Sequence, residues 1–327
     1  MIRAVTADTL QLALDNLLSP PVLGFALGLL AVAVGGDLRL PDAVYQGLSM
    51  YLLLAIGIKG GVALREAGLG EVIVPAIAAV ALGLAIPVLA YMALRLLTRL
   101  GPLDRGAIAA HYGSTSLVTF TAALVFLEAS SIAFDGYVTT LLALMEVPGI
   151  VVGLLLAGRA GSRSLPWSAS LREILAGKSV LLLLGGLVIG SLTGSAGYAR
   201  IEPFFGALFI GILTLFLIEL GTLAGRRLGD VRAAGPGLPV FAFAFPVLMG
   251  ALGVVTGAAI GLQVGTATVL GVLCASASYI AAPAAVRLAL PEANPGAYLA
   301  ASLGMTFPFN LVIGIPLYLA IAETVIA

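Results

Sequence analysis

Charged residues and cysteine are both scarce in this chain of 327 residues. Only 10% of the residues are charged, against about a quarter in soluble domains, while 61% are hydrophobic and the mean hydropathy is +1.14. So little polar surface cannot cover a water-soluble globule, which excludes a soluble enzyme. The 16 basic and 16 acidic residues cancel, so the charge balance gives no reason to expect nucleic acid as a partner. The single cysteine, Cys274, excludes an internal disulfide and a cysteine-based metal site.

Long stretches without charge divide the chain into membrane spans. A bilayer core of about 30 Å needs roughly 20 apolar residues per helix. Nine stretches qualify, three of them interrupted by one charged residue: 16–36, 43–64, 72–94, 106–127, 136–158, 179–199, 203–225, 233–286 and 293–322. The eighth is long enough for two helices, which the turn-prone Gly261, Gln263 and Gly265 separate. The sequence therefore predicts an all-α membrane protein with ten transmembrane helices.

Basic residues are divided unequally between the two predicted faces. Ten spans place both termini on one face, whose loops carry only Arg3, Arg65 and Arg200. The opposite face carries Arg39, Arg95, Arg99, Arg105, Arg159, Arg163, Arg172, Lys178, Arg226, Arg227, Arg232 and Arg287. Because cytoplasmic loops are enriched in Lys and Arg, we expect an inner-membrane protein with both termini outside the cytoplasm. We interpret residues 1–19 as an interfacial helix, not a cleavable signal peptide.

The two halves of the chain resemble one another. VLGFALGLLAVAVGG from Val22 matches VLLLLGGLVIGSLTG from Val180, and HYGSTSLVTFTAAL from His111 matches LCASASYIAAPAAV from Leu273. Each unit has five spans, so the second unit crosses the membrane in the opposite sense. Such inverted repeats are typical of secondary transporters with midplane sites. We expect a first repeat over 1–157, a cytoplasmic linker over 158–178 and a second repeat over 179–327.

Spans four and nine each carry a small, hydroxyl-rich cluster at mid-span, HYGSTS from His111 and CASASY from Cys274. Gly and Ser at this density weaken a helix, so each span is predicted to break into two half-helices. Facing half-helix N-termini would bind a small anion. The alternative is ordinary tight helix packing. The candidate substrate-binding residues are Gly113, Ser114, Thr115, Ala275, Ser276 and Ala277.

A carboxylate and an amide occupy nearly matching positions beside prolines. Glu146 lies in MEVPG of span five, and Asn310 lies in FPFNL of span ten. A carboxylate at mid-membrane costs roughly 2.5 to 3.5 kcal/mol, so it should be paired, wetted or bound to an ion. With Ser116 and Ser278, the two residues form an all-oxygen set suited to sodium. The alternatives are a protonated Glu146 bonded to a backbone carbonyl and a proton-coupling site.

Two residues of opposite charge, Lys59 and Glu219, interrupt spans two and seven at matching repeat positions. The repeat relation would bring them to similar depth in the membrane. We regard them as a candidate gate pair. The alternative is that each side chain reaches water separately.

Two other classes of protein were weighed against a transporter. His111 with Ser114 is the only base and nucleophile at suitable spacing, no acidic orienting group is evident, and no HExxH or GxSxG motif is present, so an enzyme is not expected. A passive anion channel needs rings of pore-lining groups, usually with rotational symmetry. An inverted repeat with midplane helix breaks favours alternating access instead.

Three motifs closely resemble those of the cyanobacterial-type sodium-dependent bicarbonate transporters: GSTS at Gly113, CASASYIAAPAAVRLALPEANP from Cys274 and ASLGMTFPFNL from Ala301. The resemblance extends from Ser19 to Asn310. It implies two inverted five-helix units, with spans one, two, six and seven forming a gate domain that trimerises. The other six spans would form a core domain, in which the broken helices four and nine cross.

The same resemblance implies a function. It predicts a sodium-bicarbonate symporter that works by alternating access, with the anion held where spans four and nine cross. It also implies a soluble PII-like regulator on the cytoplasmic face. Two residues depart from the family pattern, because Glu146 replaces an aspartate and Lys59 replaces a neutral residue. The alternative function is a sodium- or proton-coupled carrier of another small anion.

Overall fold

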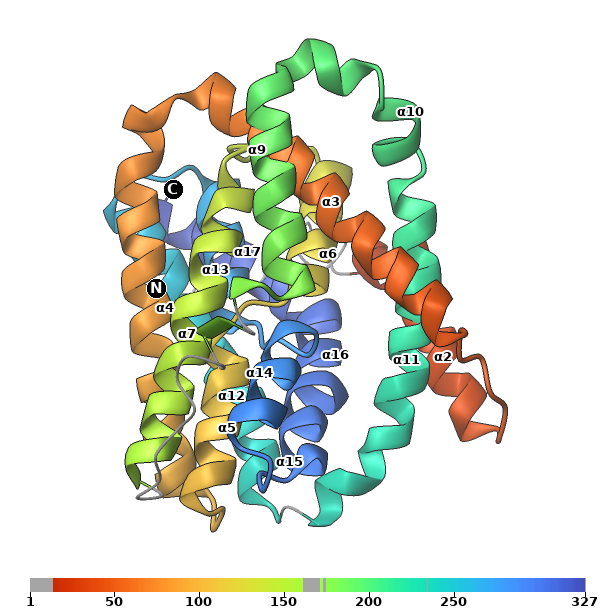
Figure 1. The fold of residues 1–327 in the computed structure, drawn as a ribbon, viewed down its shortest axis with the longest axis vertical. Helices are drawn as coiled ribbons and strands as arrows, with labels where there is room; N and C mark the ends of the chain where they lie inside the picture. The colour runs from red at the N-terminus through yellow and green to blue at the C-terminus, as the bar shows by residue number, and fades with distance from the viewer. Residues whose placement is uncertain (1–13, 161–170, 173–174, 234, 327) are drawn as a thin grey trace.

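The computed structural model describes residues 14–160, 171–172, 175–233 and 235–326 (Figure 1). Every regular element in this part of the chain is a helix, which confirms the predicted all-α class. The expected interfacial helix lies largely outside the described residues, and so does the middle of the expected linker, including Pro166 and Trp167.

The described residues form the following helices. Their bounds are α2 Pro20–Ala33, α3 Asp42–Ala67, α4 Leu69–Leu97, α5 Pro102–Gly113, α6 Leu117–Ala129, α7 Val138–Ala160, α9 Lys178–Ala199, α10 Glu202–Phe205, α11 Phe209–Ala233, α12 Gly237–Ala259, α13 Val264–Ala275, α14 Ala281–Ala289, α15 Pro295–Leu299, α16 Phe307–Phe309 and α17 Ile315–Ile326. Two π-helices, η1 Ala300–Thr306 and η2 Asn310–Gly314, flank α16.

Eight helical stretches in the described chain are long and apolar enough to cross a membrane. They are Asp42–Ala67, Gly70–Leu97, Pro102–Ala129, Val138–Arg159, Lys178–Ala199, Glu202–Arg227, Gly237–Ala259 and Pro295–Ile326. Two shorter apolar helices, α2 and α13, lie where the first and ninth spans are predicted. The chain is therefore a multi-pass membrane protein. The predicted division near Gly261 is present, since α12 ends at Ala259 and α13 begins at Val264.

Two helix pairs are held by close backbone contact. Helix α2 packs along α11, and α3 packs along α9; α2 and α11 lie on the side of the molecule opposite α4, and α3 runs diagonally from that side to the upper centre (Figure 1). A Cβ atom on Gly28 would overlap the carbonyl oxygen of Ile218, and one on Gly61 would overlap that of Leu187. Small residues allow this close approach. In lipid, where the hydrophobic effect does not drive helices together, the resulting van der Waals contacts stabilise the pair.

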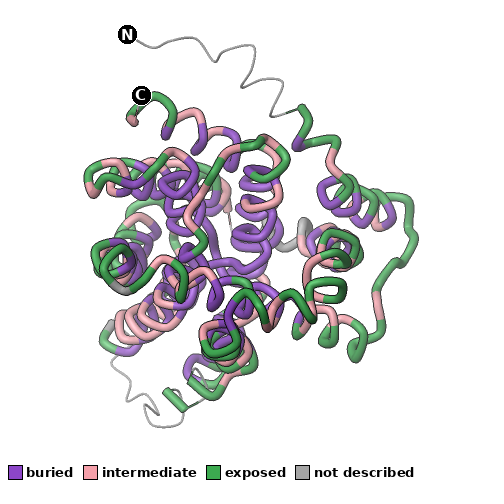
Figure 2. The backbone as a smooth tube through the Cα atoms, turned by 90° about the horizontal axis from the view of Figure 1, so that it is seen from above, coloured by how far each residue is buried: buried purple, intermediate pink, exposed green. Residues whose placement is uncertain are grey.

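Buried positions concentrate in the middle of the molecule, and the peripheral helices carry exposed positions on their outward sides (Figure 2). Helices α4, α5 and α7 pack together on one side of this centre, and α12 packs on α13. The last span is irregular because Pro308 and Pro316 donate no backbone hydrogen bond, and its two π-helices widen the turns around α16.

A charged contact joins Asp37, which follows α2 and lies outside the membrane spans, to the end of α11. The backbone N–H of Arg39 donates to Oδ1 of Asp37 at 3.0 Å, and Nη2 of Arg226 lies 2.9 Å from Oδ2. The backbone hydrogen bond is the main cause that lowers the pKa of Asp37, and the charges of Arg226 and Arg39 lower it further. This contact holds the loop between α2 and α3 beside α11.

Candidate functional site

Two helices are interrupted near the centre of the molecule, at the hydroxyl-rich clusters. Helix α5 ends at Gly113 and α6 begins at Leu117, while α13 ends at Ala275 and α14 begins at Ala281. A serine hydroxyl caps each second half: Oγ of Ser116 accepts from the N–H of Thr119 at 3.2 Å, and Oγ of Ser278 accepts from that of Ala282 at 3.3 Å. These bonds satisfy amides that a helix N-terminus leaves free.

The two interruptions bond directly to each other. The N–H of Ser116 donates to Oγ of Ser276 at 2.9 Å. In return, the N–H of Ser278 donates to the carbonyl oxygens of His111 and Ser114 at 2.7 and 3.1 Å. Buried backbone groups that leave a helix need such partners. Each broken segment therefore satisfies polar groups of the other.

A cleft lies beside the interruptions, where α3, α7 and α9 come together. Its lining is Leu53, Thr115, Ser116, Leu117, Leu142, Glu146, Ser179, Leu183, Ser278, Tyr279, Ile280 and Ala281. Glu146 is 93% buried, since its exposed fraction is 7%. No group in the described chain forms a hydrogen bond or ion pair with its carboxyl. A buried carboxyl without a protein partner points to a ligand in the cleft.

Three of the four predicted sodium ligands meet in this cleft, and the fourth does not. Ser116, Glu146 and Ser278 line it. Asn310 is not among the lining residues, because protein groups use both ends of its amide. Its Nδ2 donates to the carbonyl oxygen of Ala275 at 2.8 Å, and its Oδ1 accepts from the hydroxyl of Tyr318 at 2.9 Å. Asn310 thus ties the last span to α13.

The hydroxyls of the predicted anion set have different surroundings. Thr115 lines the cleft. Oγ of Ser276 bridges the N–H of Ser116 and the carbonyl oxygen of Leu273, each at 2.9 Å. Oγ of Ser114 is buried without a hydrogen-bond partner in the described structure. The hydroxyl of Thr115 makes only a long contact of 3.4 Å with the carbonyl oxygen of Leu142. Of the three hydroxyls, those of Thr115 and Ser114 therefore make no strong hydrogen bond to protein.

The small residues of that set serve helix packing. A Cβ on Gly113 would lie 2.8 Å from Cβ of Pro87 and 2.9 Å from Cα of Gly149. This contact joins α5 to α4 and α7. Ala275 and Ala277 are buried outside the cleft. The close approach that Gly113 permits is between helices, as in the packing alternative.

The cation of the predicted gate pair has a different partner. Nζ of Lys59 lies 2.8 Å from Oε1 of Glu128, whereas Oε2 of buried Glu219 accepts from the N–H of Leu40 at 2.6 Å. The two predicted partners belong to different helix pairs, because α3 packs on α9 and α11 packs on α2. The ion pair therefore links α3 to α6 at the end of that half-helix.

The predicted base and nucleophile of an enzyme do not contact each other. Nδ1 of His111 lies 2.7 Å from the carbonyl oxygen of Ala107, to which it donates, and its ring stacks on Tyr298 at 4.4 Å. Within the described residues, Nε2 of His111 and Oγ of Ser114 each lack a hydrogen-bond partner. The pair is not assembled for nucleophilic catalysis.

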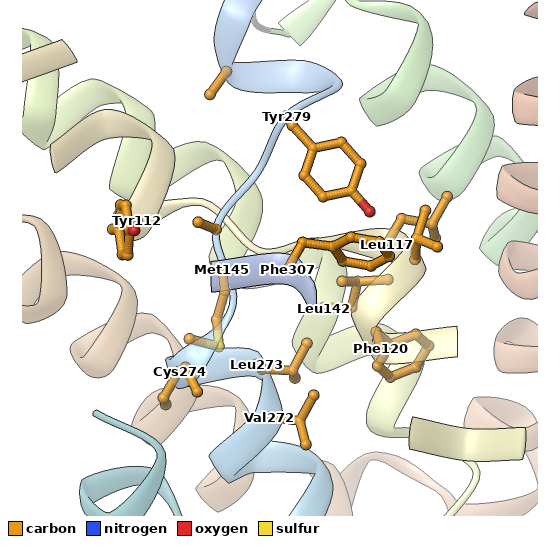
Figure 3. Close-up of a cluster of buried hydrophobic side chains, with 14 of the residues drawn as sticks. Tyr112, Leu117, Phe120, Leu142, Met145, Val272, Leu273, Cys274, Tyr279 and Phe307 are labelled. Atoms are coloured by element: carbon orange, nitrogen blue, oxygen red, sulfur yellow. The ribbon is translucent and has the colours of Figure 1, made fainter. Parts of the chain in front are cut away.

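Two polar residues of the cleft, Tyr279 and Ser179, were not in the predicted site. Tyr279 ends the CASASY cluster, and its ring packs edge-on against Phe307 at 5.3 Å. Figure 3 shows these two rings beside Leu117 and Leu142 at the interruptions. The Tyr279 hydroxyl is buried without a hydrogen-bond partner in the part of the chain that is described. Its place in the cluster is a signal that could have found it, whereas Ser179 stands in no motif.

Two similarities to known proteins were found, and they differ greatly in extent. A CDP-archaeol synthase from Pyrococcus horikoshii is 35% identical over 64 residues, which are 20% of this chain and 38% of that protein. So short a match carries no conclusion about activity. The family model of the Na+-dependent bicarbonate transporter superfamily instead matches residues 20–323. Because that match covers nearly the whole chain, the chain belongs to the Na+-dependent bicarbonate transporter superfamily.

Proposed function

We propose that this protein is a symporter that takes up bicarbonate together with sodium, and that both ions bind in the cleft beside Glu146 when it widens from its present volume of about 10 Å³. The single observation that carries the proposal is the Glu146 carboxyl, buried in the cleft with no protein partner among the described residues. The family supplies the identity of the two ions. A passive anion channel has no need of such a carboxylate.

The cleft has the chemistry of a sodium site. Hydroxyls of Ser116 and Ser278 line it together with Glu146. Oγ of Ser278 accepts one N–H, and Oγ of Ser116 accepts the N–H and the hydroxyl of Thr119. Carboxylate and hydroxyl oxygens suit a hard cation. The cation would replace the water that the buried carboxylate has lost. We leave Asn310 out of this set because it does not line the cleft and both ends of its amide bond to protein groups.

Bicarbonate would bind next to the cation, at the hydroxyls of Thr115 and Tyr279. Both side chains line the cleft and both can donate a hydrogen bond. An anion near an unneutralised Glu146 would be repelled, and the repulsion is strong where water is excluded. A bound sodium ion neutralises the Glu146 carboxylate and so removes this repulsion. This arrangement explains why binding of the anion would require sodium.

The packing supports an inverted repeat with two groups of helices. The first helix of each half packs on the second helix of the other, α2 on α11 and α9 on α3. We assign these four helices to the gate domain and the remaining spans to the core, with repeats over 1–157 and 179–327. The cleft lies between the groups, since Leu53 and Ser179 come from gate helices and Glu146 from the core. Movement of the core past the gate would expose the cleft alternately to each side.

Three further expectations accompany this architecture. Placement in the cell inner membrane, with both termini outside, rests on the basic residues of the loops. The homotrimer and the PII-like regulator rest on the family resemblance. Labelling of a cysteine at Ser164 only from the cytoplasm, in a Cys274→Ala background, would test the orientation.

Uptake by the purified protein in liposomes tests the function. Labelled bicarbonate should accumulate when a sodium gradient points inward, and collapse of the gradient should abolish accumulation. Flux that is indifferent to sodium would support a channel. Accumulation driven by a pH gradient without sodium would support proton coupling. Either result would overturn the proposal.

A further inference from the structure

A second cavity, of about 110 Å³, shares no lining residue with the cleft. It lies farther along α3 and α6, because Lys59 follows Leu53 on α3 and Glu128 follows Leu117 on α6. Most of its lining is apolar. Its polar side chains are Lys59, Glu128, Thr139 and Tyr198.

Lys59 is the one cationic side chain in the lining of this cavity. Its ammonium lies 2.8 Å from the Glu128 carboxylate, and the two side chains are 59% and 47% exposed. Exposed ion pairs contribute about 0 to 1 kcal/mol. A second anion in the cavity can therefore replace Glu128 at the ammonium at little cost.

Two hydroxyl donors complete the surroundings of the ammonium. Thr139 and Tyr198 line the same cavity, and neither hydroxyl has a hydrogen-bond partner in the described structure. Thr139 is held in place because it packs against Gly60, where a Cβ would overlap its side chain. An ammonium and two hydroxyls offer hydrogen-bond donors to a small oxyanion with several acceptor oxygens.

We propose that this cavity is an entry site that captures the bicarbonate anion before it reaches the cleft. Lys59 binds the anion, Thr139 and Tyr198 donate hydrogen bonds to it, and Glu128 occupies the ammonium when the anion is absent. The inference deepens the proposed function and rests on it for the identity of the anion. A small oxyanion of another kind would use the same groups.

In the proposed site, Lys59 attracts the anion and Glu128 competes with it. Substitutions of the two residues can therefore distinguish an anion site from an ion pair that only holds α3 and α6 together. Lys59→Gln removes the binding cation and leaves Glu128 to repel anions, so the KM for bicarbonate should rise about tenfold, or about 1.4 kcal/mol. Glu128→Gln frees the ammonium, so the KM should fall severalfold. Lys59→Arg should keep a KM near that of wild type. Lys178→Gln, which removes an exposed lysine bonded to Gln46, is the matched control.

If the ion pair only holds α3 and α6 together, the two substitutions should change the KM in the same way, because loss of either partner breaks the same contact. A shift of the KM in the same direction for Lys59→Gln and Glu128→Gln would therefore overturn the capture site. So would a KM that neither change alters.

Binding can be measured without transport. Ile210 lines the cavity and is 47% exposed, so Ile210→Cys in a Cys274→Ala background should react with a thiol reagent. Bicarbonate, but not chloride, should slow this reaction in a dose-dependent way, and Lys59→Gln should abolish the protection. Protection without uptake would refute the symporter and leave the capture site standing. Uptake without protection would refute the capture site alone.

Discussion

The paired helices and the interrupted centre are stabilised in opposite ways. In the pairs α2 with α11 and α3 with α9, glycines bring backbones into contact and leave no space for a methyl group at Gly28 or Gly61. In the centre, backbone amides and serine hydroxyls bond across the gap between two broken helices. Close van der Waals packing stabilises the helix pairs, whereas hydrogen bonds stabilise the interrupted centre.

This difference indicates where a ligand can bind. Among the described residues, none of the fully buried side-chain atoms that lack a hydrogen-bond partner belongs to the four paired helices. The centre keeps several, since the carboxyl of Glu146 and the hydroxyls of Ser114 and Tyr279 have no hydrogen-bond partner within the described chain. Unused polar groups in a buried region are costly unless a ligand pairs with them.

Asn310→Ala should have the largest effect on stability. It leaves the Ala275 carbonyl and the Tyr318 hydroxyl without their partner, and each unsatisfied buried group costs about 1 to 3 kcal/mol. Thermal unfolding in detergent should show the loss. Sodium dependence of the remaining uptake should be unchanged, and a large rise in the sodium requirement would return Asn310 to the ion site.

Gly61→Ala should separate α3 from α9. The new methyl group would overlap the backbone of Leu187, and overpacking of this kind costs about 1 to 3 kcal/mol. The unfolding midpoint should fall. Gly47→Ala in the same helix is the control, because nothing lies within 4 Å of its added Cβ. Equal stability of the two variants would contradict the packing that distinguishes the pairs from the centre.

Glu146→Gln should raise the sodium concentration for half-maximal uptake about tenfold, which corresponds to about 1.4 kcal/mol. The substitution keeps an oxygen but removes the charge that attracts the cation. Sodium titrations of uptake at several pH values provide the measurement. Glu66→Gln changes an exposed carboxylate on α3 and should leave the titration unaltered. If Glu146→Gln left the sodium titration unchanged, the assignment of the sodium site to the cleft would be wrong.

Ser114→Ala and Ser276→Ala should differ although the two residues hold matching positions. Ser276 bridges two backbone groups, so its loss should cost about 0.5 to 1.5 kcal/mol of stability. Ser114 has no partner for its hydroxyl, so its loss should change the unfolding midpoint little. If the two variants unfolded at the same temperature, the proposed division of roles at the interruptions would be wrong.

The smallest effect should come from Asp37→Asn at the end of the α2 and α11 pair. The pKa of Asp37 is lowered in the folded protein, so its ionised form stabilises the fold above the ordinary aspartate pKa. That contribution disappears as the pH falls through the lowered value. The variant should unfold slightly below wild type at neutral pH and together with it in strong acid. A difference that persists in acid would show another cause.

The helix breaks could be predicted because their causes are local. Gly113 and the serines that follow it weaken a helix wherever they stand, and the serine caps lie within four residues of the amides they satisfy. The sequence also singled out Glu146, because a carboxyl in an apolar run needs a partner; its role as an ion ligand stays a prediction. The roles of Asn310 and Gly113 could not be predicted, since they depend on Ala275 and Gly149 in other helices.

The sequence by itself determined that this is a multi-pass helical membrane protein, where its helices break, and which family it resembles. These properties follow from hydropathy, local helix propensity and contiguous motifs. Only the tertiary structure decided that Lys59 pairs with Glu128, and that Asn310 is bonded to protein while Glu146 is not. Whether a buried polar group is free for a ligand depends on neighbours that are distant in the chain, which helix packing alone brings within hydrogen-bond distance.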